Sequence, residues 1–210
     1  MAKPILKSDA LNPSSPEGLD PATRAEMELT AGCQEIRFLV ERGYLSMARE
    51  KLEEVFSKGR QIKNHHLVEP AIVLLQAYEK NKQYQSANEL FKQYESILGE
   101  SQVALTLAGS SCLNLNDSQQ AENFLEGAIQ KDSSYPDPYL LLGDLYAKSQ
   151  PDKAVSYYSQ YYDLRSSIMG ARIFIKRVKS LLKTNSLSFK NLSIAFIGNF
   201  TIEPIKDFLE

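Results

Sequence analysis

The chain has 210 residues, of which 43% are hydrophobic, and its formal net charge at pH 7 is −2. This is the composition of a globular protein, and the charge gives no bulk electrostatic reason to bind nucleic acid or a membrane. The apolar runs are far shorter than the ~20 residues of a membrane-spanning helix, so the sequence predicts a cytoplasmic protein.

Residues 1–23 contain Pro4, Pro13, Pro16 and Pro21 together with several serines. They include no apolar stretch that suits a secretion signal. We interpret them as a flexible leader before a helical domain at residues 24–184.

The next part of the chain repeats itself at a shift of about 34 residues, a period typical of stacked helical hairpins. The first copy has Ala71, Leu74, Leu75, Tyr78, Ala87, Phe91 and Tyr94, and the second has Leu105, Ala108, Gly109, Cys112, Ala121, Leu125 and Ala128. A third copy has Tyr139, Leu142, Gly143, Tyr146, Ala154, Tyr158 and Tyr161, if one residue is dropped from the turn at Gln150 and Pro151. A degenerate leading hairpin supplies Gly32, Glu35, Ile36, Leu39, Ala48, Leu52 and Val55. The pattern therefore predicts four hairpins. Unrelated amphipathic helix pairs would not share one 34-residue period.

The small residues of the repeat have a packing role. We expect Ala87, Ala121 and Ala154 where the second helix approaches the first, because helix axes pack only about 8–10 Å apart. One hairpin cannot bury its own apolar face, so each depends on its neighbours.

The connection between the first two hairpins is longer, at residues 58–67, and contains His65 and His66. No cysteine or carboxylate cluster accompanies them, so we interpret both as solvated loop residues without a metal. Phosphate loops and nucleophile elbows are missing as well, and the sequence predicts no catalytic residue and no cofactor. Among Tyr157, Tyr158, Tyr161 and Tyr162, we expect some in the core and the others at its edge.

The slots from Tyr139 to Tyr158 resemble those of the tetratricopeptide repeat (TPR) family, over roughly residues 29–168. The resemblance implies an all-α, right-handed superhelix of about four hairpins and a capping helix. It also implies a concave groove, lined by the first helices, that binds a protein or peptide. The family's groove positions fall on one stripe of Cys33, Ile72, Thr106 and Leu140, and on a second of Arg37, Gln76, Ser110 and Asp144.

Both cysteines, Cys33 and Cys112, fall within first helices. We expect two reduced thiols rather than a disulfide, with Cys112 packed inward.

After the fourth hairpin, residues 171–183 read as a capping helix. The expected apolar side has Ile173, Phe174, Val178, Leu181 and Leu182, and the other side has Arg172, Lys176, Arg177, Lys179 and Lys183. We interpret the cations as a solvated outer face, with an acidic partner or a lipid surface as the alternatives.

Residues 185–210 read as a polar linker, a short buried strand at 192–197, a turn, and a helix capped by Thr201. A lone strand cannot satisfy the backbone hydrogen bonds at its two edges. The sequence therefore predicts the truncated beginning of an α/β domain that continues past Glu210. A generic flavodoxin-like strand and turn would look similar.

Residues 194–205 resemble the opening of FkbH-like proteins. The resemblance implies a haloacid-dehalogenase-type domain. In polyketide pathways, such proteins move a glyceryl unit onto an acyl carrier protein. No catalytic aspartate of that family can be placed in this sequence.

We therefore interpret the chain as a non-catalytic docking module of a larger, FkbH-like biosynthetic protein, which recruits a protein or peptide such as an acyl carrier protein. The activity of the full-length protein stays open. The alternative is a structural scaffold or self-association module, a homodimer for instance, with no link to FkbH-like chemistry.

Overall fold

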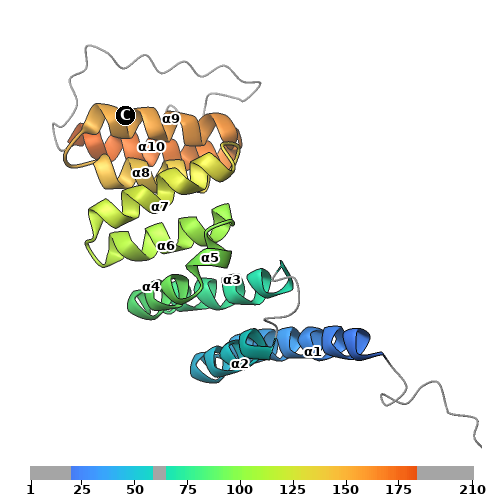
Figure 1. The fold of residues 1–210 in the computed structure, drawn as a ribbon. Coiled ribbons are helices and arrows are strands. Elements are labelled where there is room, and N and C mark those ends of the chain that lie inside the picture. Colours follow the sequence, from blue (N-terminus) through green and yellow to red (C-terminus); the bar gives the residue numbers. More distant parts are fainter. Residues whose placement is uncertain (1–19, 59–64, 184–210) are drawn as a thin grey trace, which may run out of the picture.

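The computed structural model describes residues 20–58 and 65–183 (Figure 1). These ranges hold ten helices and no strand. The helices are α1 (Pro21–Glu41), α2 (Leu45–Lys58), α3 (His65–Lys80), α4 (Tyr84–Gln93), α5 (Glu95–Leu98), α6 (Gln102–Asn114), α7 (Ser118–Lys131), α8 (Asp137–Tyr146), α9 (Pro151–Leu164) and α10 (Ile168–Lys183). The predicted strand, the FkbH-like residues and most of the leader lie outside the described residues.

Four helical hairpins form the array, and the prediction of four hairpins and a cap is confirmed. The pairs are α1–α2, α3–α4, α6–α7 and α8–α9, stacked in chain order, with α10 against α9 (Figure 1). Helix α1 begins at Pro21, ahead of the predicted domain boundary at residue 24. Asp20 caps this helix, because its carboxylate accepts a hydrogen bond from the backbone N–H of Thr23 at 3.0 Å.

The turns inside the hairpins repeat as well. Gly43, Lys82 and Asn116 follow α1, α3 and α6, and all three have positive φ, between 59° and 80°. In the α6–α7 turn, the N–H of Asp117 then bonds back to the carbonyl of Cys112 at 2.9 Å. In the fourth hairpin, the equivalent slots Tyr146 and Ala154 are one residue closer in sequence than Cys112 and Ala121 in the third, and no residue between α8 and α9 has a positive φ. The N–H of Gln150 bonds to the carbonyl of Tyr146 at 2.8 Å, which confirms the predicted deletion.

The small residues lie in the helix contacts, as predicted. Ala48, Ala87, Ala121 and Ala154 are at most 1% exposed. Large second-helix residues fill the space beside them, and these include Phe91 at 0%, Leu125 at 0% and Tyr158 at 1% exposed. Burial of these side chains at each layer stabilises the stack, at roughly 25 cal/mol per Å² of apolar surface.

The second hairpin departs from the pattern. Leu75 in α3 occupies the slot that holds Gly109 in α6 and Gly143 in α8, and it is fully buried. Helix α4 ends at Gln93, and Tyr94 breaks the helix with φ −119° before the short α5. Tyr94 still fills its slot, because its ring stacks on Phe56 with centroids 4.0 Å apart.

Two expectations for the first connection and the first hairpin are wrong. Helix α3 already begins at His65, so His65 and His66 belong to its first turn rather than to a loop. Glu35, which was assigned to a core slot, is exposed and pairs with Lys51 at 2.9 Å. A carboxylate in that slot turns to solvent because burial of an unpaired charge is costly.

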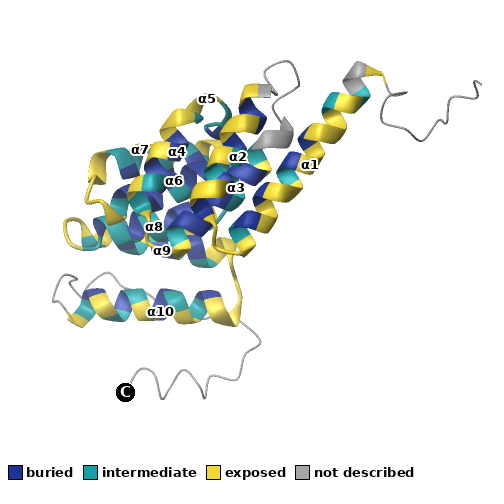
Figure 2. Ribbon diagram, turned by 90° about the horizontal axis from the view of Figure 1, so that it is seen from below, coloured by how far each residue is buried: buried dark blue, intermediate teal, exposed yellow. Residues whose placement is uncertain are grey.

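Helix α10 buries one side against the array and exposes the other (Figure 2). Its buried residues are Gly170, Phe174, Ile175, Val178 and Leu181. The prediction missed Ile175, and it placed Arg177 among the solvated cations. Arg177 is instead half-buried and bonded to Asp144 at 2.6 Å.

Candidate functional site

The first helices of the hairpins form one continuous layer. Helix α1 contacts α3, α3 contacts α6, and α6 contacts α8. The eight predicted groove residues lie on these four helices at equivalent slots. We call the side of the layer on which these slots lie the first-helix face.

The first predicted stripe holds three half-buried side chains and one buried threonine. Cys33, Ile72 and Leu140 are half-buried. Thr106 is only 6% exposed, and its hydroxyl donates to the backbone carbonyl of Gln102 in the same helix at 2.7 Å. Thr106 is therefore satisfied inside the layer and offers little to a partner.

The second predicted stripe is polar, and its members differ in accessibility. Arg37 and Gln76 are exposed, and Asp144 is half-buried. Ser110 is 8% exposed, and its hydroxyl donates to the carboxylate of Glu79. Of this stripe, Gln76 presents an exposed amide with no charge of its own.

Polar contacts join neighbouring helices of the layer. Arg37 of α1 pairs with Glu69 of α3, and Glu79 of α3 accepts from Ser110 of α6. Sequence reasoning named Arg37 and Ser110 but missed both glutamates. The signal was weak, because a single glutamate on a helix surface is most often a solvated residue.

Asp144 is the best-connected groove residue. It accepts hydrogen bonds from the Tyr158 hydroxyl at 2.8 Å and from the Arg177 guanidinium at 2.6 Å. Burial raises the pKa of this carboxyl, while the Tyr158 hydrogen bond and the Arg177 charge act to lower it. The three side chains tie α8, α9 and α10 together at the end of the first-helix face.

Neither cysteine is activated. Burial raises the pKa of the Cys112 thiol to about 11, and the charge of Asp117 adds to this effect. Burial also raises the pKa of Cys33, with a further contribution from Glu69. Cys33 and Cys112 do not form a disulfide, as predicted, and Cys112 is fully buried. A raised pKa keeps a thiol protonated and unreactive at neutral pH.

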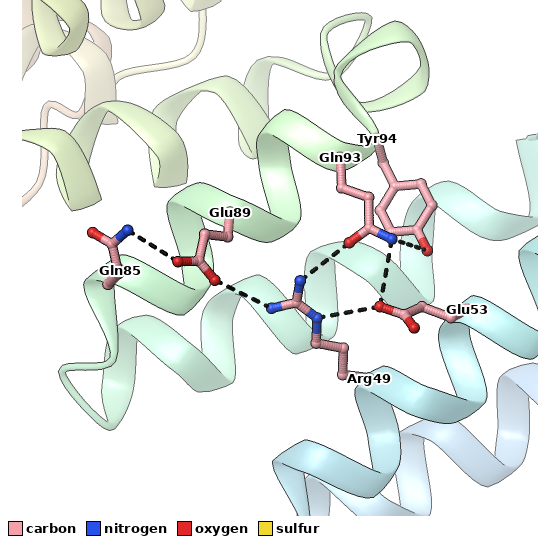
Figure 3. A network of polar contacts seen from close by, with 6 residues as sticks. All are labelled: Arg49, Glu53, Gln85, Glu89, Gln93 and Tyr94. Atoms are coloured by element: carbon pink, nitrogen blue, oxygen red, sulfur yellow. Dashed lines mark hydrogen bonds and ion pairs between the residues drawn. The ribbon is translucent and has the colours of Figure 1, made fainter.

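A cleft that the sequence did not predict lies between α2, the end of α3 and the start of α4, with a volume of about 580 Å³. Its lining is formed by Ser46, Arg49, Glu50, Glu53, Tyr78, Gln83 and Ser86. Beside it, Arg49 contacts Glu53 at 3.4 Å, Gln93 at 3.1 Å and Glu89 at 3.8 Å (Figure 3). The contacts with Gln93 and Glu89 of α4 join the first two hairpins, and all three contacts engage Arg49, the one cation among the residues that line the cleft.

Residues 20–58 and 65–183 contain no group of three or more histidine, cysteine or acidic side chains arranged to hold a metal ion. In the same ranges, no helix has both the length and the apolar character of a membrane span.

Comparison with known proteins places the fold. No protein-family model matches the chain, and no curated protein sequence does. A crystal structure of MamA protein is 18% identical with a TM-score of 0.58, covering 80% of this chain and 97% of that one. MamA from Desulfovibrio magneticus RS-1, from residue 41 to its end, is 19% identical with a TM-score of 0.56, covering 75% and 91%. Likeness at this level of identity concerns the fold. The predicted all-α superhelix of TPR type is confirmed for the described part of the chain.

Proposed function

We propose that the chain is a protein-interaction module that docks a protein or peptide partner on its first-helix face. The observation that supports this most is the continuous layer of α1, α3, α6 and α8, in which the equivalent slots of α1, α3 and α8 present half-buried apolar side chains. Stacked hairpins provide a long continuous inner surface of this kind, and surfaces of this kind are what repeat proteins use for binding.

The accessible chemistry of the face indicates the kind of segment it suits. Cys33, Ile72 and Leu140 offer apolar area, and Gln76 offers an uncharged donor and acceptor. Arg37 and Asp144 are engaged with other residues of the chain. The middle of the face therefore suits an apolar and uncharged stretch of the partner.

The finer proposal is that the module belongs to an FkbH-like protein and recruits a carrier protein. Its support is the resemblance of residues 194–205, which lie outside the described residues. A DNA sequence that continues past Glu210 into a strand followed by an Asp-x-Asp motif would support this link, and a continuation without such a motif would contradict it.

The docking proposal is tested with two matched substitutions. Gln76→Trp places a bulky side chain on the first-helix face, and Gln130→Trp places the same side chain at an exposed position of α7. Proteins captured from a lysate by the unmodified chain are identified, purified and titrated against all three forms by calorimetry. We expect Gln76→Trp to weaken binding by at least about tenfold, and Gln130→Trp to leave it within about twofold. Equal binding by both variants, or a loss confined to Gln130→Trp, contradicts the proposal.

One observation favours the alternative of self-association. On the first hairpin, Met27, Phe38, Tyr44 and Met47 are all between 53% and 59% exposed. Exposed apolar side chains of this size mark contacts between proteins when they form one contiguous patch. Light scattering over a wide concentration range checks this, and a monomer at every concentration argues against it.

A further inference from the structure

A third stripe lies on the first-helix face beside the two predicted ones. It consists of the residues that directly follow the last core slot of each first helix, namely Val40, Glu79, Leu113 and Ala147. All four are half-buried. The three apolar members pack against the core, whereas the second hairpin has a carboxylate in this slot. The repeat therefore accepts an apolar side chain here, and its packing does not require an acid.

Glu79 is on the same side of α3 as two predicted groove residues. Ile72, Gln76 and Glu79 are separated by four and three residues, the spacing of neighbours on one side of a helix. The carboxylate of Glu79 accepts the hydrogen bond from the Ser110 hydroxyl of α6, a groove residue of the next hairpin. This contact places the carboxylate at the junction of α3 and α6, in the middle of the first-helix layer.

The charge of Glu79 is not balanced inside the described part of the chain. Arg37 and Asp144, the two charged residues of the predicted stripes, each form an ion pair with another residue. No lysine, arginine or histidine among the described residues pairs with Glu79, and its hydrogen-bond partner Ser110 is neutral. A partly buried carboxylate loses hydration, and this loss is costly when no cation compensates for it.

The contact with Ser110 does not explain why this residue is an acid. A glutamine would offer the hydroxyl an acceptor oxygen without the cost of partly burying a charge. One carboxylate is also too few to hold a metal ion, and the described residues contain no group of three metal-binding side chains. A negative charge that a neutral donor holds in place, within an otherwise apolar stripe, instead matches a single cation of a bound segment.

We propose that Glu79 pairs with one lysine or arginine of the docked partner segment. This inference rests on the proposed function, because it adds one cation to the apolar and uncharged stretch that lies along the first-helix face. The hydrocarbon stem of the cationic side chain contacts the apolar members of the third stripe, while its charged end reaches Glu79. Such a pair fixes the register of the partner on the face, since only one position of the segment bears the charge.

The experiment uses two synthetic peptides of about nine residues with blocked ends, rich in leucine and serine. They differ only at the central position, which is lysine in one peptide and glutamine in the other. Fluorescence anisotropy measures the affinity of each for the full chain. We expect the lysine peptide to bind at least about fivefold more tightly, and this preference to shrink as NaCl is raised from about 50 to about 200 mM.

Three variants locate the residue that recognises the lysine. Glu79→Gln removes the charge and keeps an acceptor for Ser110, so it should bind the two peptides about equally. Glu126→Gln, at an exposed position of α7, makes the same change in net charge and should keep the preference for lysine. Glu79→Lys should reverse the preference, because two cations repel each other. Thermal melting checks that every variant is folded.

Three results would overturn the proposal: equal affinity or no binding of the two peptides by the unmodified chain, a preference for lysine that survives Glu79→Gln, or a preference that Glu126→Gln removes. Failure of this inference is distinguishable from failure of the docking proposal. Partner binding that depends on Gln76 but not on Glu79 refutes the inference alone. A lysine preference that depends on Glu79, without any effect of Gln76→Trp on the partner, refutes the docking face alone.

Discussion

Gly143 of α8 lies directly under the ring of Tyr158 of α9, so closely that a β-carbon on Gly143 would be 2.3 Å from Cε1 of the tyrosine. Contacts below 3.0 Å are not tolerated by real side chains. The ring cannot easily withdraw, because it is 1% exposed and its hydroxyl is bonded to Asp144 at 2.8 Å. The glycine is therefore required for the fourth hairpin to close.

The first prediction concerns this contact. Gly143→Ala should lower the free energy of unfolding by about 1–3 kcal/mol, the usual cost of overpacking a filled core. Urea denaturation monitored by circular dichroism measures it. The matched control is Gly127→Ala in α7, where the added carbon meets nothing nearer than 3.8 Å. Alanine is the better helix former, so this control should be neutral or stabilising by up to about 1 kcal/mol. A Gly143→Ala variant as stable as the control would mean that α8 and α9 are not packed as described.

The second prediction concerns the pH dependence of stability. Burial raises the pKa of Asp144 in the folded chain above its ordinary value of 3.8. The folded state then binds a proton more tightly than the unfolded state. The contribution of this carboxyl to stability is therefore lost as pH rises from 3.8 through the raised pKa, and is constant above it.

Asp144→Asn removes this titration. The stability of the unmodified chain, measured relative to the variant by urea denaturation between about pH 4 and pH 7, should fall as pH rises. The variant also lacks the ion pair with Arg177. Above the pH range in which Asp144 titrates, this loss adds a constant amount to the difference in the free energy of unfolding. Asp163→Asn, at an exposed position of α9, is measured in the same way, and its effect is subtracted as that of replacing a surface carboxylate. If the difference in the free energy of unfolding between the unmodified chain and Asp144→Asn is flat or rises with pH, burial is not the main influence on the pKa of Asp144.

The third prediction concerns thiol reactivity. At pH 8, Cys112 should resist a thiol reagent in the folded chain, because it is fully buried and its pKa is raised to about 11. Cys33 is half-buried and should react first, though more slowly than a free cysteine. In denaturant both cysteines should react at once. Mass spectrometry of partly labelled protein reads the order directly, and rapid labelling of Cys112 without denaturant would contradict its place in the core.

The repeat pattern predicted most of the fold because its slots carry strict packing demands. Ala121 and Ala154 can be found in the sequence since their fully buried helix contacts favour a small side chain, and the deletion near Gln150 was visible as a missing residue between repeat slots. The break at Tyr94 was not predictable, because neither glycine nor proline marks it. The ring of Tyr94 stacks on Phe56, a residue far away in the sequence, and the sequence does not show this contact.

The candidate site was predictable only as a set of slots. Thr106 and Ser110 occupy the expected positions, yet their short hydroxyls find partners within the layer and stay buried. Long side chains mislead in another way. Arg177 was expected to be a solvated cation, but its guanidinium bonds to Asp144, 33 residues away in the sequence. Helical spacing gives the direction of a side chain, and it does not give the partner on the next helix.

Leu75 in the second hairpin has a mechanical consequence. A leucine in place of glycine puts a larger, fully buried side chain at this slot of α3, and α4 itself stops at Gln93. The hairpins on its C-terminal side close on Gly109 and Gly143 with little slack. We therefore expect the array to bend under load mainly at its second hairpin, near the N-terminal end, and to resist bending at the third and fourth.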